Sequence, residues 1–394
     1  MIELKQILAK LRKLNIVMFA CMIGLCIMGV MFIYSACSVR ENHDLQLQYM
    51  KHAVIAIVGL MAYMILACLN YKKLIKWSWV FYLACLVLLV MVPFFGTSVM
   101  GARRRIFDIQ PAEFAKLAMI MVLAWLYGRH SNLNGFLMFC ITGAIVGLPC
   151  ILILSQPDLG TALVMVPTTF AMMFAGKIAP RYIWSTFLVG IIVAGTILGV
   201  ICAVEKRDLT KDEKVERIIA ITHLKKHQVE RLQVFMYPDK DLHGSGYTRR
   251  QAEIAVGSGG VHGKGYLKGE LYALGYLPPS VSANDFIFAV LAEESGFTGS
   301  VMVLLLFSGL LAAGLWTAFR CQFNSGRFFC VGVVTLIFSH MFINIAMTIG
   351  LMPITGLPLP FISYGGTFML TMLLALGLVQ SVSIYGREPS TSFD

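Results

Sequence analysis

One aspartate stands where a proline-rich turn gives way to an apolar run. Asp285 directly precedes Phe286–Phe288, and a carboxylate held beside apolar side chains can act as a general base or bind a metal ion. The same pattern fits a short helix over residues 283–295, with Ser282 as its N-cap, Asp285 at the third helical position and Gly296 closing it. Pattern alone leaves both interpretations open.

Two opposite charges, three residues apart, interrupt an apolar stretch at residues 112–128. Glu113 and Lys116 would share one face of a helix that begins at Pro111, where they can form an ion pair. The alternative is a carboxylate that stabilises the first helical turn and a lysine that extends outward to water. Lys116 lies a turn or more inside the stretch, so that route to water is poor. The sequence therefore favours a charge pair that lines a polar cavity.

A further aspartate follows a break between two apolar stretches. Asp158 belongs to residues 155–160 (SQPDLG), a composition typical of a tight turn before a helix. In the first turn of that helix its carboxylate would stabilise the N-terminal dipole. Alternatively, Asp158 belongs to a functional site. The pattern gives the two interpretations equal weight.

The glycine-rich segment Gly257–Gly265 (GSGGVHGKG) resembles a nucleotide-binding P-loop only superficially. Ser258 stands where the first glycine belongs, and Gly265 stands where the Mg²⁺-binding Ser or Thr belongs, so the pattern fails at both ends. The composition favours a flexible surface turn. The alternative is a nest of backbone amides with Lys264 binding a phosphate or a sugar.

The composition shows that membrane-spanning helices must hold these groups. Of the 394 residues, 58% are hydrophobic and only 13% are charged, and the mean hydropathy is +0.77. Soluble domains carry about a quarter charged residues, so this apolar surplus cannot be buried in one water-soluble core. The net charge of +11 lies between apolar blocks and indicates membrane topology, not nucleic-acid binding. The ten cysteines contain no CxxC pair, so neither a zinc site nor a disulfide framework is predicted.

Ten apolar blocks are long enough to cross a bilayer core of about 30 Å. They lie at residues 16–36, 53–69, 77–95, 112–128, 136–154, 158–175, 182–204, 299–319, 328–350 and 364–385. With ten spans, both termini lie on the same side of the membrane. That side carries 13 Lys and Arg residues against five in the short loops of the other side, which predicts cytoplasmic termini. Residues 283–295 are too few to span and are predicted to form a short helix at the outer surface.

The long polar stretch at residues 205–282 falls on the outer side, as a subdomain within a single membrane domain that covers residues 1–394. Apolar residues at near-helical spacing predict an amphipathic helix over residues 209–235 that lies on the membrane. Residues 103–105 are three consecutive arginines just outside the membrane, where guanidinium groups are well placed to bind phosphate.

Residues 356–366 (GLPLPFISYGG) contain two prolines and three glycines between two apolar spans. Such a segment cannot form a helix, yet it is too apolar for a solvated loop. Irregular backbone at membrane depth is tolerated only against protein or a water-filled cavity. The segment is therefore predicted to fold back into the outer half of the protein.

Five motifs, in order along the chain, resemble those of the SEDS family, the shape, elongation, division and sporulation proteins. They are residues 110–116 (QPAEFAK), 156–163 (QPDLGTAL), 263–265 (GKG), 284–297 (NDFIFAVLAEESGF) and 356–366 (GLPLPFISYGG). The resemblance covers essentially the whole chain. The GKG element and the short tails are more similar to the RodA (elongation) branch than to the FtsW (division) branch.

The resemblance implies an all-α polytopic membrane fold of about ten helices, with one large extracytoplasmic loop between spans 7 and 8. It implies a peptidoglycan glycosyltransferase in the bacterial cytoplasmic (inner) membrane, which polymerises lipid II at the outer face and releases undecaprenyl diphosphate, in cell elongation and shape maintenance. It also implies a class B penicillin-binding protein, a transpeptidase, as partner.

The resemblance further implies roles for particular residues. The essential aspartate of the family corresponds to Asp285, and its intramembrane charge pair corresponds to Glu113 and Lys116. Besides that pair, the candidate substrate-binding residues are Arg103, Arg104, Arg105, Asp158, Gln251, Lys264, Ser363 and Tyr364.

The chain departs from the family pattern at four positions. Asn284 stands where the family usually has threonine, and Pro279 stands where it has glutamate. Residues 104–106 read Arg-Arg-Ile instead of Arg-Trp-Ile, and alanine replaces a common serine after Gln251. The catalytic candidate Asp285 is retained, so the departures concern recognition of substrate or partner.

The implied reaction needs a base and a positive charge. The 4-hydroxyl of GlcNAc on one lipid-linked disaccharide attacks the anomeric carbon of another, and Asp285 is the candidate to take its proton. The leaving diphosphate needs positive charge, which the three arginines, Lys116, Lys264 or a divalent cation can supply. Oxygen ligands favour Mg²⁺ or Mn²⁺ over zinc. The sequence does not choose among these cations.

A lipid II flippase is the alternative from another functional class, because buried charges also line translocation pathways. Transporters typically place such charges near the midplane and often consist of two related halves. Here the polar motifs cluster toward the outer face and no internal repeat is visible, which favours the enzyme. A third alternative, a catalytically inert scaffold for the crosslinking enzyme, is disfavoured by the retained Asp285.

Overall fold

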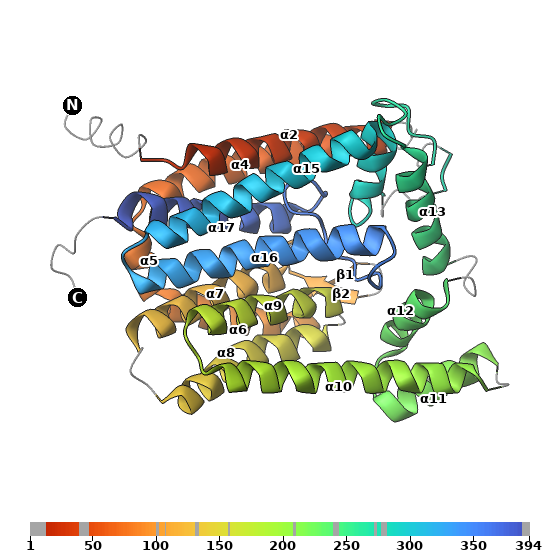
Figure 1. The fold of residues 1–394 in the computed structure, drawn as a ribbon, viewed down its shortest axis with the longest axis horizontal. Helices are drawn as coiled ribbons and strands as arrows, with labels where there is room; N and C mark the ends of the chain where they lie inside the picture. The colour runs from red at the N-terminus through yellow and green to blue at the C-terminus, as the bar shows by residue number, and fades with distance from the viewer. Residues whose placement is uncertain are drawn as a thin grey trace.

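The computed structural model describes residues 13–38, 47–99, 102–106, 108–130, 134–156, 158–207, 210–238, 244–271, 274–276 and 282–387. Long apolar helices run side by side through the body of the molecule, and shorter polar helices lie across one end of it (Figure 1).

Within the described ranges, ten apolar helices form this bundle. They are α2 (Ile16–Ser38), α4 (Gln48–Cys68), α6 (Ser78–Phe95), α7 (Pro111–Arg129), α8 (Gly135–Ser155), α9 (Leu159–Ala175), α10 (Pro180–Glu205), α15 (Ile287–Arg320), α16 (Asn324–Thr348) and α17 (Gly366–Tyr385). Nine are long and apolar enough to cross a membrane, and α9, with 17 residues, is only slightly shorter. Each coincides with one predicted block, so the all-α polytopic fold is confirmed for the described residues.

The helices differ in how much of their surface the protein itself covers. Helices α7 and α17 are buried along most of their length, whereas α10 exposes nearly all of its apolar side chains. Helix α16 packs on α7, α9 and α15, and α17 packs on α4. An apolar helix that is exposed in the protein alone must face lipid. Glu113 and Lys116 lie on α7 and are therefore shielded from lipid by the neighbouring helices.

Local sequence signals set several helix boundaries. Pro111 occupies the first turn of α7, where a missing amide hydrogen costs nothing. Asn134 begins α8 by accepting a hydrogen bond from the backbone amide of Phe136. Thr210 and Glu213 form a reciprocal capping box at the start of α11 (Lys211–Thr222).

The polar stretch folds into α11, α12 (Lys226–Met236) and α13 (Ser245–Ser258), at the end of the bundle opposite the basic helix α5 (Tyr71–Lys76; Figure 1). The prediction of one amphipathic helix over residues 209–235 is wrong. His223 adopts a φ of +55°, which ends α11 and separates it from α12. Their apolar side chains form a small core with the end of α10, made of Ile201, Val204, Val215, Ile218 and Val229.

The predicted short helix near Asp285 exists, but its position and surroundings differ from the prediction. It begins at Ile287, as the first part of α15, and it is broken from the rest of α15 at Gly296, where φ is +66° and ψ is −161°. Residues 287–294 are all buried, so the segment lies inside the protein and not at its surface. The break at Gly296 is confirmed, and the long remainder of α15 supplies the span.

The proline-rich segment between α16 and α17 is confirmed as irregular and buried. Residues 351–359 contain no helix, and Leu357, Leu359 and Phe361 are almost fully buried. Close to the segment lies a hairpin of β1 (Thr97–Val99) and β2 (Ala102–Arg105), which carries the consecutive arginines. Both elements lie near Asp285: a Cβ placed on Gly356 would be 3.4 Å from its Oδ2, and Arg104 of β2 acts electrostatically on its carboxylate.

Candidate active site

Asp285 lies in a turn that precedes α15 and is held there through its backbone. The turn covers residues 283–286, and Phe286 is the N-cap of α15. The side-chain amide of Asn344 on α16 donates to the carbonyl oxygen of Asp285 at 2.8 Å and to that of Leu357 at 2.7 Å. Asp285 is therefore not at the third helical position, and the capping interpretation of its carboxylate is wrong.

The carboxylate of Asp285 forms no hydrogen bond or ion pair with any described residue, although cations lie nearby. Burial raises its pKa to about 6, an effect that Arg231 and Arg104 oppose and Asp158 reinforces. The side chain is still partly exposed. A carboxylate with a raised pKa, a remaining opening and no fixed partner has the properties of a general base.

Arg231, on α12, is the main site residue that the sequence did not indicate. Its Nη1 donates to the carbonyl oxygen of Thr355 at 3.0 Å. Gly356 lies between the two charges, because a Cβ placed on it would be 3.4 Å from Asp285 Oδ2 and 3.8 Å from Arg231 Nη2. Burial and the neighbouring Arg104 lower the pKa of Arg231. This crowded positive charge favours the binding of an anion.

Asp158 caps α9, immediately before the first helical turn where it was predicted, and its role in a functional site stays a prediction. Its Oδ1 accepts from the backbone amide of Thr161 at 3.2 Å, which caps α9. Its Oδ2 accepts from the side-chain amide of Gln110 at 3.0 Å, and its charge acts on both Asp285 and Arg231. A helix cap therefore also contributes negative charge to the site.

Glu113 and Lys116 form the predicted ion pair. Lys116 Nζ lies 2.9 Å and 3.1 Å from the two carboxylate oxygens of Glu113, and both side chains are almost fully buried. His340 on α16, another residue the sequence did not indicate, places its Nε2 2.9 Å from Lys116 Nζ. Since a lysine ammonium only donates, His340 must accept at Nε2. The pair is thus held between two of the most buried helices.

Two arginines of the hairpin, Arg104 and Arg105, act on different groups. Side chains alternate in direction along a strand, and Arg104 acts electrostatically on Arg231 and Asp285, whereas Arg105 acts on Tyr364. The side chain of Arg103 lies outside the described residues. Of the two, only Arg104 acts electrostatically on Asp285.

Ser363 and Tyr364 support the site through the backbone. The hydroxyl of Ser363 accepts from the backbone amide of Leu359 at 2.7 Å, and the amide of Tyr364 donates to the carbonyl oxygen of Ala283 at 2.9 Å. Ala283 belongs to the turn that contains Asp285. Burial raises the pKa of the Tyr364 hydroxyl. Their direct contact with a substrate stays a prediction.

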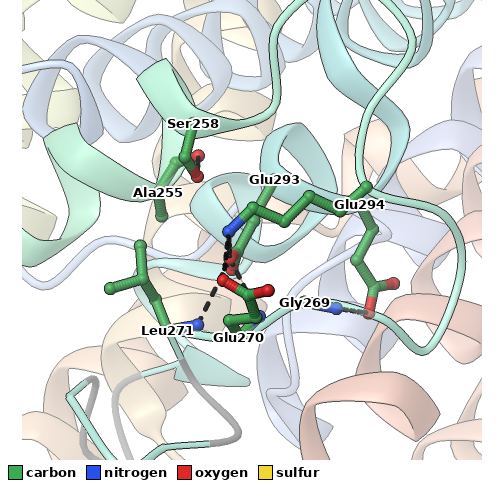
Figure 2. A network of polar contacts seen from close by, with 8 residues as sticks. Ala255, Ser258, Gly269, Glu270, Leu271, Glu293 and Glu294 are labelled. Carbon is green, nitrogen blue, oxygen red and sulfur yellow. Dashed lines mark hydrogen bonds and ion pairs between the residues drawn. The ribbon is translucent and has the colours of Figure 1, made fainter.

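Gln251 belongs to α13, and Lys264 belongs to the glycine-rich segment that follows it. Lys264 Nζ is 2.8 Å from Glu293 Oε1 and 3.1 Å from Glu270 Oε2, so its charge is already matched within the network of Figure 2. Gln251 is a partly buried residue of α13. For both, a role in substrate binding stays a prediction.

No group of three or more His, Cys, Asp or Glu side chains that could hold a metal ion occurs among the described residues. Asp158 and Asp285 nevertheless provide carboxylate oxygens, and the charge of Asp158 acts on Asp285. Mg²⁺ typically keeps several waters and binds one or two carboxylates together with substrate phosphates. Oxygen donors of this kind suit a hard divalent cation, and its binding here stays a prediction.

Comparison with known proteins places the chain in a family. The FtsW/RodA/SpoVE family profile, described as "Cell cycle protein", matches residues 15–388. The chain is 30% identical to the peptidoglycan glycosyltransferase MrdB of Escherichia coli over 374 residues, covering 93% of this chain and 94% of MrdB. It is 31% identical to the peptidoglycan glycosyltransferase RodA of Treponema pallidum, covering 92% and 95%.

Solved structures share the fold. One, described as "Structural coordination of polymerization and crosslinking by a peptidoglycan synthase complex", superposes with a TM-score of 0.70 at 24% identity, covering 93% of this chain and 97% of that one. The family profile covers nearly the whole chain, including all ten apolar helices and the turn that carries Asp285. The chain therefore belongs to the FtsW/RodA/SpoVE (SEDS) family of cell cycle proteins.

Proposed function

We propose that this protein is a RodA-like peptidoglycan glycosyltransferase that polymerises lipid II at the outer face of the bacterial cytoplasmic membrane. The observation that carries the proposal is Asp285, a carboxylate of raised pKa that no described residue binds and that lies beside the guanidinium groups of Arg231 and Arg104. The relatives named peptidoglycan glycosyltransferases support the same activity.

Asp285 acts as the general base in this mechanism. The 4-hydroxyl of one GlcNAc attacks the anomeric carbon of a second lipid-linked disaccharide, and Asp285 accepts the hydroxyl proton as the glycosidic bond forms. The bond between the anomeric carbon and the diphosphate oxygen breaks, so undecaprenyl diphosphate leaves. The raised pKa suits the task, because a base is most effective when its pKa approaches the working pH.

Arg231 and Arg104 are the cations that stabilise the leaving diphosphate. The sequence offered Lys116 and Lys264 for this role, but both form short ion pairs with glutamates. Arg231 uses one nitrogen on a carbonyl oxygen and has no carboxylate at salt-bridge distance among the described residues. A guanidinium can bind two phosphate oxygens at once, which suits a diphosphate.

A divalent cation, Mg²⁺ or Mn²⁺, would bind through Asp158 and the substrate diphosphate. When bound, it would supply further positive charge to the leaving group. The part that the chain itself plays is unchanged by it: Asp285 takes the proton, and Gln110 fixes the orientation of Asp158.

The Lys/Arg distribution supports cytoplasmic termini and an outward-facing site. Helix α5, which carries Lys72, Lys73 and Lys76, lies at the end of the bundle opposite α11–α13 (Figure 1).

The Gly-Lys-Gly motif at residues 263–265 supports the elongation branch of the family over the division branch. A class B penicillin-binding protein is the proposed partner, because the structurally similar complex couples polymerization to crosslinking.

Purified lipid II distinguishes the enzyme from a flippase. We expect the purified protein in detergent, with or without the partner, to convert labelled lipid II into glycan strands visible on a gel. A flippase would instead move lipid II across liposome membranes without making polymer. Transport without polymer would overturn the proposal.

The pH dependence of the reaction should report Asp285. Since Asp285 must be ionised to act as the base, kcat/KM should be constant above its pKa of about 6 and fall as the pH is lowered through that value. At pH 5 only about a tenth of the sites would be active, whereas an ordinary aspartate would remain about nine-tenths ionised there. The measurement is the initial polymerisation rate at subsaturating lipid II. A profile that stays flat down to pH 5 would exclude Asp285 as the titrating base.

Replacing Arg231 should weaken both the reaction and the binding of diphosphate. We expect Arg231→Gln to lower kcat/KM by about a hundredfold, the scale for one lost electrostatic contact to the developing negative charge. Inhibition by undecaprenyl diphosphate should weaken in parallel, while inhibition by the uncharged polyprenol should not. Arg217→Gln, an exposed charge on α11, is the matched control. Unchanged inhibition by the diphosphate would assign the leaving group to other cations.

A further inference from the structure

A second charged network lies beyond the proposed active site. It joins the glycine-rich segment that follows α13 to the short first part of α15, and its carboxylates are Glu293 and Glu294. Both are buried, with at most 2% of their surface exposed. Neither side chain takes part in the proposed reaction. Burial of two adjacent carboxylates is costly unless hydrogen bonds and ion pairs stabilise them, so the groups that bond to them are important for the local structure.

The break in α15 exposes backbone groups that the glycine-rich segment satisfies. A helix end leaves carbonyl oxygens without partners, and a helix start leaves amides without partners. The amides of Lys264 and Gly265 donate to the carbonyl oxygens of residues 293 and 294 at 3.0 and 2.9 Å. On the other side of Gly296, the amides of residues 297 and 298 donate to the carbonyl oxygens of residues 260 and 261 at 2.9 and 3.1 Å. The segment thus bridges the break from both sides.

The bridge requires glycine where the two backbones cross. A Cβ on Gly263 would lie 2.1 Å from the carbonyl oxygen of Glu294, and a Cβ on Gly296 would lie 2.3 Å from the amide nitrogen of Gly263. Both glycines also have positive φ, +76° and +66°, a conformation that other residues rarely adopt. Gly263, in the segment that does not match a P-loop, is therefore required by its close approach to the backbone at Gly296.

One oxygen of Glu293 anchors the loop that follows. Glu293 Oε1 accepts from Lys264 Nζ at 2.8 Å and from the backbone amides of Glu270 and Leu271 at 2.9 and 3.2 Å. Figure 2 shows these groups converging on it. The neighbouring Glu294 accepts from the amide of Gly269 at 3.4 Å and from the hydroxyl of Ser35 on α2. Residues 263–271 therefore close around the two carboxylates.

We propose that this clamp, formed by the backbone of residues 260–271, the side chain of Lys264 and the carboxylate of Glu293, sets the position of Asp285, with Lys264 as its positioning residue. The proposal rests on the proposed function of Asp285. The clamped carboxylate and Asp285 lie at opposite ends of one buried helical segment, which spans about 9 Å from Ile287 to Glu293 at 1.5 Å per residue. A short rigid helix transmits a shift at one end to the other. Loss of the Lys264 charge releases the loop and lets the turn with Asp285 move away from its reacting position.

The test compares Lys264→Met with Lys268→Met. Lys268 lies on the same loop with an exposed side chain that forms no ion pair with the described residues, so it is the matched control. For Lys264→Met we expect kcat to fall by about ten- to a hundredfold, because a displacement of about 1 Å from reacting geometry can cost a hundredfold. The KM for lipid II should change by less than about twofold, because a residue that acts only by positioning Asp285 leaves substrate binding largely unchanged. Lys264→Arg should recover much of the loss, and Lys268→Met should behave as wild type.

Hydrogen exchange supplies a readout that does not depend on activity. Peptides covering residues 285–298 should exchange faster in Lys264→Met, while α17 should be unchanged. If Lys264→Met does not fold, Glu293→Gln serves instead, since it keeps an oxygen for the two backbone amides and loses only the charge that holds Lys264. Its expected effects on kcat and on exchange are the same.

The outcomes separate the clamp from the proposed function. If Lys264→Met has normal kcat per folded molecule and normal exchange while Asp285→Asn is inactive, the clamp is overturned and the proposed function stands. A loss of folded protein with unchanged kcat also overturns the positioning role. If Asp285→Asn polymerises lipid II normally, the proposed function fails, and with it the role of the clamp in catalysis.

Discussion

Asp285→Asn should remain folded and reach the membrane at its normal level, yet polymerise lipid II at least about a hundredfold more slowly, the scale for a lost general base. An amide has the shape of the carboxylate but cannot accept the proton at neutral pH. The structure gives little reason for instability, because Asn344 holds the backbone of this residue and no described residue bonds to its carboxylate. The measurement is glycan synthesis per folded molecule in detergent, together with partner binding.

Glu230→Gln provides the control for Asp285→Asn. Glu230 is a partly exposed carboxylate on α12, next to Arg231 in sequence, so its neutralisation changes the charge near the site without removing the base. We expect near-normal synthesis from Glu230→Gln. Near-normal synthesis from a well-folded Asp285→Asn protein would exclude Asp285 and make Asp158 the next carboxylate to test.

Single charge removals at Glu113 and Lys116 should be far more destabilising than the double removal. Glu113→Gln leaves a buried ammonium, and Lys116→Met leaves a buried carboxylate, each at a cost of about 3–5 kcal/mol. The double variant contains neither, so it should be more stable than the sum of the single changes predicts, with a coupling energy of at least about 1 kcal/mol. The geometry supports this strongly, since the two side chains are 0% and 4% exposed and 2.9 Å apart. Unfolding in detergent micelles provides the free energies.

Glu253→Gln is the matched control for this cycle. Glu253 pairs with Arg249 at 2.8 Å, but its side chain is 40% exposed, and exposed pairs contribute less than about 1 kcal/mol. We expect only a small change in stability from it. If the effects at Glu113 and Lys116 are additive, the two residues are not energetically paired.

The ten spans could be predicted closely because hydropathy is a local property. Each block of about 20 apolar residues reports its own environment, and Pro111 marks the start of α7 directly. The pairing of Glu113 with Lys116 was equally accessible, because three residues of helix bring them together. Asp285 was identified by resemblance, since its pattern alone also fitted a helix cap. That cap is absent, because α15 starts at Ile287, two residues after Asp285.

The site residues that could not be identified from the sequence are those that contact segments far away in the chain. Arg231 looks like any charge on a mixed polar helix, and only its contact with Thr355, 124 residues away, places it beside Asp285. His340 reaches Lys116 across 224 residues. Composition predicts a flexible turn for the glycine-rich segment, since composition cannot show that the segment bridges the break at Gly296. Sequence patterns record local geometry, and these contacts are set by tertiary packing.

The burial of the charge pair in α7 has a consequence for how the chain enters the membrane. Helix α7 has the lowest mean hydropathy of the nine long spans among the described residues, 1.2 against 1.9 to 2.7 for the others, and a lysine inside a span opposes insertion, by up to about 2.5–3.5 kcal/mol at its centre. His340 and most of the helices that surround α7 are synthesised much later. Helix α7 must therefore insert with Glu113 and Lys116 already neutralising each other, assisted by α6, which precedes it and packs against it. The ion pair thus also favours biogenesis, because it lets a polar helix enter the bilayer before the later helices have been synthesised.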